Sequence, residues 1–366
     1  MSEPNLSMSN DRVVFLTGFP GFIASRLLRR LAREGGRFLL LVQPALAERA
    51  KEELKNIAGD TGRSLSDFAL LQGDITQSNL GLSPADLETA RSQSTVVFHL
   101  AAIYDLAVAQ DIAMRVNVEG TRNVNQFAAS LPHLAHYHYI STCYVAGKRK
   151  GVIYEHELRH NAGFRNYYEE TKYLAEIEVD ELKSALPITI HRPAVVCGDS
   201  HTGETAKYDG IYYLIHYLLK WPLLLSAFNI GNSEVTLNLV PVDFVVEAIS
   251  ALARDPLSIG KTVQIADPNP LTTRQLFNTI ARSIAGKEAR VTLPASLVQT
   301  SLMLPLAPKI TDLPHSAVPY FFLKQTYDTT EATSLLAPHG VSCPPFESYV
   351  ETIADYAARH PVLNDH

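Results

Sequence analysis

Cysteine is scarce in this sequence, which has only Cys143, Cys197 and Cys343 among its 366 residues. Three cysteines this far apart indicate neither a disulfide framework nor a metal cluster. The first eleven residues are polar and include no apolar run of the kind that a secretory signal needs. Both features predict a cytoplasmic protein with a disordered N-terminus over residues 1–11.

The sequence also lacks a strong excess of charge of either sign. Its 32 basic and 38 acidic residues give a formal net charge of -6, so a nucleic-acid partner is not expected. Charged residues make up 19% and apolar residues 46%, which is typical of a globular chain rather than a disordered one. This composition predicts a folded protein with a sizeable core.

No apolar run is free of polar interruptions over the length of a membrane span. The most apolar stretch, 211–230, contains His216, Lys220 and Pro222, and the proline would break a spanning helix near its middle. We interpret the stretch as a buried or substrate-covering helix followed by a turn. Peripheral contact with a membrane is compatible with its composition.

A metal site is not predicted. In the cluster of Glu155, His156, Glu157 and His160, the two histidines have the i, i+4 spacing of ligands on one helix face. A third ligand is not apparent, so we expect no bound metal.

The chain does contain a regular alternation of short apolar runs and helical stretches. The apolar runs are 12–17, 38–42, 68–73, 95–100, 138–141, 188–191 and 262–265, and the clearest helical stretches are 107–129 and 167–184. Runs that are apolar throughout are typical of parallel strands buried on both faces of a sheet. Their alternation with helices predicts an α/β fold with a doubly wound parallel sheet of the Rossmann type.

The alternation fades after about Cys197, where aromatic, leucine and proline residues increase. We therefore predict two domains that share an interface. A dinucleotide-binding Rossmann domain would comprise 12–200 plus 236–266, and a smaller, mainly helical C-terminal substrate domain would comprise 201–235 plus 267–366. Ligands of parallel α/β sheets bind at the carboxyl ends of the strands, so the cleft between the domains is the expected site.

A glycine-rich turn follows the first predicted strand and reads Thr17-Gly18-Phe19-Pro20-Gly21-Phe22-Ile23-Ala24. Gly18 and Gly21 allow a tight turn and a close approach of the backbone to a pyrophosphate. The small side chain of Ala24 allows close packing of helix against strand. Many βα turns contain glycine for structural reasons alone, but the position between the first strand and a helix favours dinucleotide binding.

Tyr168 and Lys172 lie four residues apart in a predicted helix, so both are on one face, one turn apart. A lysine ammonium beside a phenol favours the phenolate and lowers the pKa of the tyrosine from its reference of about 10. An ordinary amphipathic helix can also contain such a pair. Ser141 and Thr142 follow the predicted strand 138–141, at the edge where this architecture places catalytic groups, although capping hydroxyls at a strand end are equally common.

The ordered combination of motifs is more specific than any single motif. In chain order these are the glycine turn, Gly73-Asp74-Ile75, His99-Leu100-Ala101-Ala102, Asn117-Val118-Glu119-Gly120-Thr121, Ser141-Thr142, Tyr168-x3-Lys172 and Arg192-Pro193-Ala194. In order and spacing the set resembles the extended short-chain dehydrogenase/reductase superfamily over nearly the whole chain.

The resemblance implies roles for these residues. Tyr168 would be the general acid, Thr142 the hydrogen-bond partner of the carbonyl oxygen, and Lys172 the ligand of the nicotinamide ribose. Asn117 would brace the sheet. The implied cofactor-binding residues are Thr17, Gly18, Phe19, Pro20, Gly21, Phe22, Ile23, Gln43, Asp74, Ile75, Ala101, Ala102, Tyr168, Lys172, Pro193 and Val195.

Three further segments, 198–204, 239–245 and 343–349, look like the thioester-reductase branch, which includes fatty acyl-CoA reductases and the reductase domains of carboxylic acid reductases. The resemblance implies NADPH-dependent reduction of an acyl thioester to an aldehyde, and with a second hydride to an alcohol. The substrate would be a fatty acyl-CoA or an acyl-carrier thioester. We expect it to be free or on a separate carrier, because the chain has neither a carrier-protein nor an adenylation module.

Other functions fit the same motifs. One alternative is a dehydrogenase or reductase of an aldehyde, a ketone or a steroid-like alcohol, and another is a sugar-nucleotide epimerase. A non-catalytic NADP-binding scaffold is disfavoured, because the Thr142, Tyr168 and Lys172 set is complete. The aromatic and leucine residues of 211–230 and 302–306 would line an acyl pocket or belong to an ordinary core, since both have this composition. The sequence gives no oligomeric state.

The position after the second predicted strand bears on the cofactor. Gln43 lies there, where the thioester-reductase branch often has arginine, and the first carboxylate beyond it is Glu48. An NAD enzyme normally presents Asp or Glu about 20 residues past the glycines to bind the ribose diol. Without that acid a 2′-phosphate is not repelled, and Arg49 or Lys51 could reach it. We therefore predict NADP rather than NAD.

Overall fold

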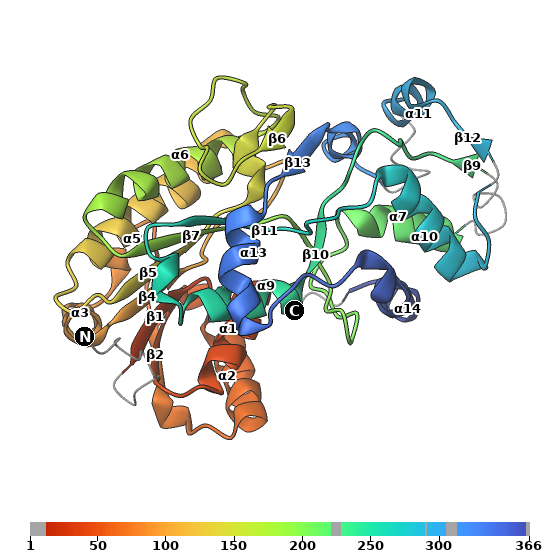
Figure 1. The fold of residues 1–366 in the computed structure, drawn as a ribbon. Coiled ribbons are helices and arrows are strands. Elements are labelled where there is room, and N and C mark those ends of the chain that lie inside the picture. The colour runs from red at the N-terminus through yellow and green to blue at the C-terminus, as the bar shows by residue number, and fades with distance from the viewer. Residues whose placement is uncertain (1–11, 221–227, 290, 305–312, 364–366) are drawn as a thin grey trace.

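The computed structural model describes residues 12–220, 228–289, 291–304 and 313–363. Its centre is a seven-stranded parallel sheet in the order β11-β7-β5-β4-β1-β2-β3 (Figure 1). The strands are β1 (Val13–Thr17), β2 (Arg37–Val42), β3 (Phe68–Gln72), β4 (Val96–His99), β5 (His136–Ile140), β7 (Ile188–Pro193) and β11 (Thr262–Ile265). The predicted strands are all present, and their ends differ from the prediction by at most two residues.

Helices cover both faces of the sheet because successive strand residues point in opposite directions. In β1, Val14 and Leu16 pack under α1 (Phe22–Ala32), α2 (Ala47–Thr61), α9 (Val242–Leu252) and α13 (Thr330–Leu336). Val13 and Phe15 pack on the other face with α3 (Pro84–Gln93), α5 (Gly120–Ala129) and α6 (Tyr167–Glu181). The predicted doubly wound α/β fold is therefore confirmed.

The predicted helix 107–129 differs in detail from the structure. It begins as α4 (Gln110–Ala113), widens to a π-helical segment at Met114–Glu119 and continues as α5. Within the widened segment, Asn117 accepts a hydrogen bond from the Ile103 amide (2.9 Å) and donates one to the Thr171 hydroxyl (3.0 Å). Apolar spacing does not distinguish a π turn from an α turn, so the sequence pattern did not indicate it.

A second apolar core lies among α7 (Ile211–Lys220), α10 (Thr273–Ala285) and α14 (Val350–Arg359). Helix α11 (Ala295–Leu302) and the paired strands β9 (Phe228–Asn229) and β12 (Val291–Thr292) lie at the outer end of this part (Figure 1). Within the described residues, no helix combines the length and the apolar character that crossing a bilayer requires.

The division into two domains stays a prediction. Helix α13 falls in the range predicted for the substrate domain, yet its Ala332, Leu335 and Leu336 belong to the core under the large sheet. One short parallel pair connects the two predicted domains, β6 (Gly151–Ile153) with β13 (Gln325–Tyr327), while the pair of β8 (Val195–Cys197) with β10 (Leu239–Pro241) lies within the predicted Rossmann domain.

Candidate active site

The glycine turn has no room for a side chain at two positions. Gly18 has a φ of +92°, and a Cβ there would lie 2.8 Å from the Ala101 amide nitrogen. A Cβ on Gly21 would lie 2.7 Å from the Gly18 carbonyl oxygen. Gly21 is also the N-cap residue of α1 and has no side chain to cap the helix, so the first amides of α1 are available to an anion. This turn therefore fits a dinucleotide pyrophosphate.

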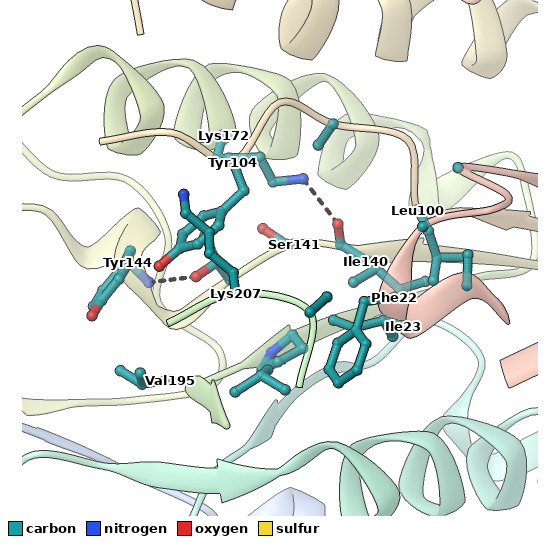
Figure 2. A pocket seen from close by; sticks show the side chains of 18 of the residues that line it. Phe22, Ile23, Leu100, Tyr104, Ile140, Ser141, Tyr144, Lys172, Val195 and Lys207 are labelled. Atoms are coloured by element: carbon teal, nitrogen blue, oxygen red, sulfur yellow. Dashed lines mark hydrogen bonds between the residues drawn. The ribbon is translucent and has the colours of Figure 1, made fainter. Parts of the chain in front are cut away.

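A cavity of about 350 Å³ opens at the carboxyl ends of β1, β4, β5 and β7 (Figure 2). Many of the predicted site residues line it together, namely Gly18, Gly21, Phe22, Ile23, Ala101, Ala102, Thr142, Tyr168, Lys172, Pro193 and Val195. Tertiary structure thus gathers residues that are spread over much of the sequence. Their roles in binding and catalysis stay predictions.

The remaining predicted residues of the glycine turn lie behind this cavity. Thr17 is fully buried, and its hydroxyl accepts a hydrogen bond from the Ala101 amide (3.2 Å). Phe19 is 2% exposed and belongs to the core under the sheet. The Pro20 carbonyl oxygen accepts a hydrogen bond from Nη2 of Arg49 (3.3 Å). These three residues support the glycine turn on the side away from the cavity.

Three predicted cofactor residues lie further along the sheet edge, after β2 and β3. The side-chain amide of Gln43 donates to Asp74 Oδ2 (3.1 Å), and Asp74 Oδ1 accepts from the Thr76 amide (2.8 Å). Ile75 is buried against Gly120. A Cβ added to Gly120 would lie 2.7 Å from Cδ1 of Ile75. Their predicted contacts with the adenine end of a cofactor stay predictions.

Tyr168 and Thr142 form the polar part of the cavity wall. Tyr168 lies in the first turn of α6 and is 7% exposed, and Thr142 follows the end of β5. Burial raises the pKa of the Tyr168 phenol, while the Thr142 side chain opposes this rise. The lowering expected from Lys172 is therefore not found, because burial outweighs it. The Thr142 hydroxyl also accepts from the Tyr144 amide (3.2 Å), which leaves its hydrogen to be donated into the cavity.

Lys172 lies one turn after Tyr168, as the spacing predicted, and is only 3% exposed. Its ammonium donates to the Ile140 carbonyl oxygen (2.9 Å), as Figure 2 shows, and to the Tyr139 hydroxyl (3.0 Å). Burial lowers the pKa of Lys172 to about 8, and the charge of Glu176 acts in the opposite direction. The lysine is therefore a cation at neutral pH and close to its titration.

Glu176 forms a buried ion pair that the sequence analysis missed. Its Oε1 accepts from Nε (2.8 Å) and Nη2 (2.5 Å) of Arg192 in β7, and its Oε2 accepts from the Ser141 hydroxyl. Buried charges need such partners, and the pair fixes α6 against β5 and β7. The only sequence sign was the continued spacing of four from Tyr168 through Lys172 to Glu176.

The mouth of the cavity is formed by residues that carry no sequence motif. The Tyr104 ring meets the Tyr168 ring edge-on at 5.1 Å, and Lys207 Nζ lies 5.4 Å from the centre of the Tyr104 ring (Figure 2). Asp209 shares a hydrogen bond with Tyr104. Two loops distant in sequence meet here, so no local pattern could have indicated the contact.

A second, larger cavity of about 590 Å³ lies among α7, α10, α11 and the 3₁₀ helix Val318–Phe322. Its lining is almost entirely apolar and consists of Ile211, Tyr213, Leu214, Tyr217, Ile230, Gly231, Thr273, Leu276, Phe277, Leu293, Leu297, Val298, Ser301, Leu302, Leu304, Leu313, Phe321 and Phe322. Of the two stretches predicted for an acyl pocket, 221–227 and 305–306 lie outside the described residues.

Residues near the first cavity are close in the chain to residues that line the second at two places. Asp209 lines the first cavity, and Ile211, two residues later, lines the second. The Tyr320 ring packs on Tyr144 of the first cavity at 4.7 Å, and the next residue, Phe321, lines the second cavity. Two segments of the chain thus pass from the surroundings of the first cavity directly to the wall of the second.

A family model of NAD-binding domains, described as male sterility protein, matches residues 16–249. The fatty acyl-CoA reductase wat of Drosophila melanogaster is 25% identical over 289 residues, which cover 69% of this chain and 56% of that protein. A carboxylic acid reductase of Segniliparus rugosus is 27% identical over 274 residues, covering 67% of this chain and 23% of that protein. The chain thus spans about half, or less, of these relatives.

A solved structure has the same fold. The terminal R domain from the myxalamid PKS-NRPS biosynthetic pathway superposes with a TM-score of 0.81 at 24% identity, covering 97% of this chain and 92% of that chain. The likeness extends through both the large sheet and the helical part that holds the second cavity.

Proposed function

Because this chain belongs to the male sterility protein family of NAD-binding domains, we propose that it is an NADPH-dependent reductase of acyl thioesters. The resemblance to the thioester-reductase branch of the extended short-chain dehydrogenase/reductases, predicted from the motifs, is confirmed. The observation that carries the proposal is the meeting of Thr142, Tyr168 and Lys172 with the glycine turn in one cavity.

The cavity fits a nicotinamide cofactor. Gly18, Gly21 and the N-terminus of α1 would hold the pyrophosphate, Lys172 would bind the ribose beside the nicotinamide, and Pro193 and Val195 would line the nicotinamide end. The cofactor supplies the hydride that reduces the carbonyl carbon of the thioester.

In this proposal, side chains of the protein stabilise the negative charge that develops on the carbonyl oxygen and supply the proton to it. Thr142 and Tyr168 donate hydrogen bonds to the carbonyl oxygen as it gains negative charge, and Tyr168 then gives up its proton to it. Lys172, one helix turn away, would favour the phenolate that remains when a bound substrate and cofactor complete the site. The product of this step is a hemithioacetal, whose carbon–sulfur bond breaks to release a thiol and leave the aldehyde. A second round of reduction would produce the alcohol.

The acyl group in this proposal is long and apolar. Supporting it, the second cavity has an almost entirely apolar wall and adjoins the first through Asp209 and Ile211. Its volume lies within the range of small-molecule pockets, and burying each methylene group contributes about 0.8 kcal/mol. An acyl chain in this cavity would place its thioester toward Tyr168.

The choice of NADPH over NADH rests on the groups around Gln43. The Gln43 amide bonds Asp74, and the Arg49 guanidinium bonds the Pro20 carbonyl of the glycine turn. That bond holds a cation beside the turn, where a 2′-phosphate would need one. Lys51 is paired with Glu48, which makes Arg49 the better candidate.

The experiment that tests the proposed function follows NADPH oxidation and thiol release in parallel. The substrates are long-chain acyl-CoA, the same acyl group on a carrier protein, a panel of ketones and a nucleotide sugar. We expect oxidation with stoichiometric thiol release on a thioester. Oxidation on a ketone without any thiol release, or epimerisation of the sugar, would instead support one of the alternative functions.

A further inference from the structure

A row of buried polar side chains runs from the active-site lysine to the glycine turn. Lys172 Nζ donates to the Tyr139 hydroxyl (3.0 Å). Burial raises the pKa of Tyr139, and the neighbouring Thr121 side chain acts in the opposite direction. The Thr121 hydroxyl bonds His99 Nε2 (3.0 Å), and His99 Nδ1 bonds the Thr17 hydroxyl (2.8 Å). All five residues are at most 3% exposed.

Sheet register explains why these residues meet. Thr17, His99 and Tyr139 are direct partners across the neighbouring strands β1, β4 and β5. Their side chains therefore point to the same face of the sheet. Thr121 in α5 and Lys172 in α6 reach this row from the helices that cover that face.

One end of the row lines the cavity, and the other end lies directly behind it. Lys172 lines it directly. At the other end, Thr17 accepts a hydrogen bond from the Ala101 amide (3.2 Å) and directly precedes Gly18. Gly18 and Ala101 both line the cavity, and the backbone of Gly18 approaches Ala101 too closely for any Cβ. The lysine and the glycine turn are thus connected through the inside of the protein.

The hydrogen bonds can be assigned in one direction along the row. An ammonium only donates, so Tyr139 accepts from Lys172 and can pass its own hydrogen to Thr121. Thr121 then donates to Nε2 of His99, whose Nδ1–H donates to Thr17. This arrangement requires a neutral His99, and burial, with the charge of Lys172, lowers the pKa of His99 to about 3.

The row leaves Lys172 with one N–H for a ligand. Among the described residues, Tyr139 and the Ile140 carbonyl take two of its three N–H groups. The Tyr139 ring also lies 4.5 Å from the ammonium, a distance at which its face attracts a cation. The position of the charge is thereby set before any cofactor binds.

We propose that Tyr139 is a positioning residue that holds the Lys172 ammonium in place and keeps it charged, and that Thr121, His99 and Thr17 hold Tyr139. The proposal rests on the role given above to Lys172 in binding the cofactor. It adds residues outside the Tyr168–Lys172 motif that control when the lysine can bind its ligand.

Three other titratable groups lie near the Lys172 ammonium, namely Glu176, Tyr168 and His99. Glu176 lies one turn further along α6, where its charge is balanced by Arg192 of β7 and by the Ser141 hydroxyl of the β5 end. Tyr168 precedes Lys172 on the same helix, and His99 is neutral. Because burial already lowers the pKa of Lys172 to about 8, the loss of one acceptor should change its charge near neutral pH.

The test is the pH dependence of NADPH binding, measured by the fluorescence of the bound cofactor with no acyl substrate present. For the wild type we expect affinity to fall as the pH rises through about 8, where Lys172 loses its charge. Tyr139→Phe keeps the ring but removes the acceptor. Hydrogen bonds to charged groups are strong enough that the transition should move down by about one to two pH units. Below the transition, both proteins should bind alike.

Tyr137→Phe is the matched control. Tyr137 lies on the same strand and the same face, is fully buried, and donates its hydroxyl hydrogen to Asn125 (2.8 Å) instead of joining the row. Its loss should lower stability without moving the binding transition. Thr121→Val should move the transition in the same direction as Tyr139→Phe but less far, and Thr121→Ser, which keeps the hydroxyl, should restore the wild-type profile.

An unshifted transition in folded Tyr139→Phe overturns the proposal, and so does an equal shift in Tyr137→Phe. If Tyr139→Phe does not fold, an unshifted transition in Thr121→Val would likewise overturn the proposal. The measurement uses no thioester, so a failure to release thiol would count against the proposed substrate only. A shifted transition would support the positioning role whatever the substrate is.

Discussion

Tyr168 of helix α6 and Thr142 at the end of strand β5 line the same cavity, where burial raises the pKa of the Tyr168 phenol and the Thr142 side chain opposes that rise. The two hydroxyl groups come from elements that are separate in sequence and lie where one carbonyl oxygen could accept from both. In the proposed mechanism, this arrangement would serve proton donation to a developing oxyanion.

Replacing Tyr168 by phenylalanine should remove nearly all turnover while NADPH binding persists. General acid catalysis typically contributes between about 10² and 10⁴ in rate, and Phe removes the proton while filling the same space. Thr142→Val should cost less, because it removes one oxyanion hydrogen bond. Tyr167→Phe is the control, since Tyr167 is the neighbouring residue and is 42% exposed. A loss below about tenfold in Tyr168→Phe would exclude Tyr168 as the acid.

NADPH should bind at least about tenfold more tightly than NADH, which corresponds to about 1.4 kcal/mol. Arg49→Ala should remove most of this difference, because it deletes the cation beside the glycine turn. Lys51→Ala should leave it almost unchanged, since Lys51 is paired with Glu48. Gln43→Asp should shift the preference toward NADH by repelling the 2′-phosphate. Calorimetric titration with both cofactors measures these affinities, and equal affinities in the wild type would contradict the expectation.

Specificity constants should rise with acyl length and then level off as the second cavity fills. A contribution of about 0.8 kcal/mol per buried methylene corresponds to roughly fourfold per carbon at most. Ser301→Trp should move the plateau to shorter chains, because Ser301 lines the cavity on α11. Thr300→Trp is the matched control, since Thr300 is the preceding residue on α11 and is exposed.

The measurement is kinetics on a series from acetyl-CoA to stearoyl-CoA, with a thermal melt for each variant. A flat wild-type profile would rule out an acyl site in this cavity.

The helix face on which a residue lies decides whether a substitution there tests the cavity or disrupts the core. Leu218 of α7 is 1% exposed in the core shared with α10 and α14, so a charge there would unfold the helix packing rather than test the cavity.

The free energy of unfolding should fall as the pH falls from about 6.5 toward 4. Burial, with smaller contributions from neighbouring charges, lowers the pKa of His99 and His191 to about 3 and that of His136 to about 4. In the unfolded chain these histidines bind protons below about 6.5, whereas in the folded protein they stay neutral, so acid favours unfolding. Each can contribute up to ~1.4 kcal/mol per pH unit within this window.

Urea denaturation at several pH values measures this effect. His136→Gln should make the dependence on pH less steep, because one buried histidine is removed. His201→Ala is the control, since the His201 side chain is 84% exposed. A stability that is constant between pH 6.5 and 4 would contradict the expectation.

Features that depend on neighbours in the chain were predictable from the sequence. The alternation of apolar runs and helical stretches predicted the doubly wound sheet, because each element's periodicity is a local property. Glycine at 18 and 21 predicted the tight turn for the same reason, and the spacing of four predicted that Tyr168 and Lys172 share a helix face.

Contacts between elements were not predictable in this way. That Lys172 meets Tyr139, that Glu176 pairs with Arg192, and that Tyr104 meets Asp209 all depend on the order of the strands and on which helix covers which face. The same limit applies to α7, whose apolar composition could not show that Leu214 and Tyr217 line a cavity while Leu218 packs in the core. Local patterns specify the faces of each element, and only packing in three dimensions decides what each face meets.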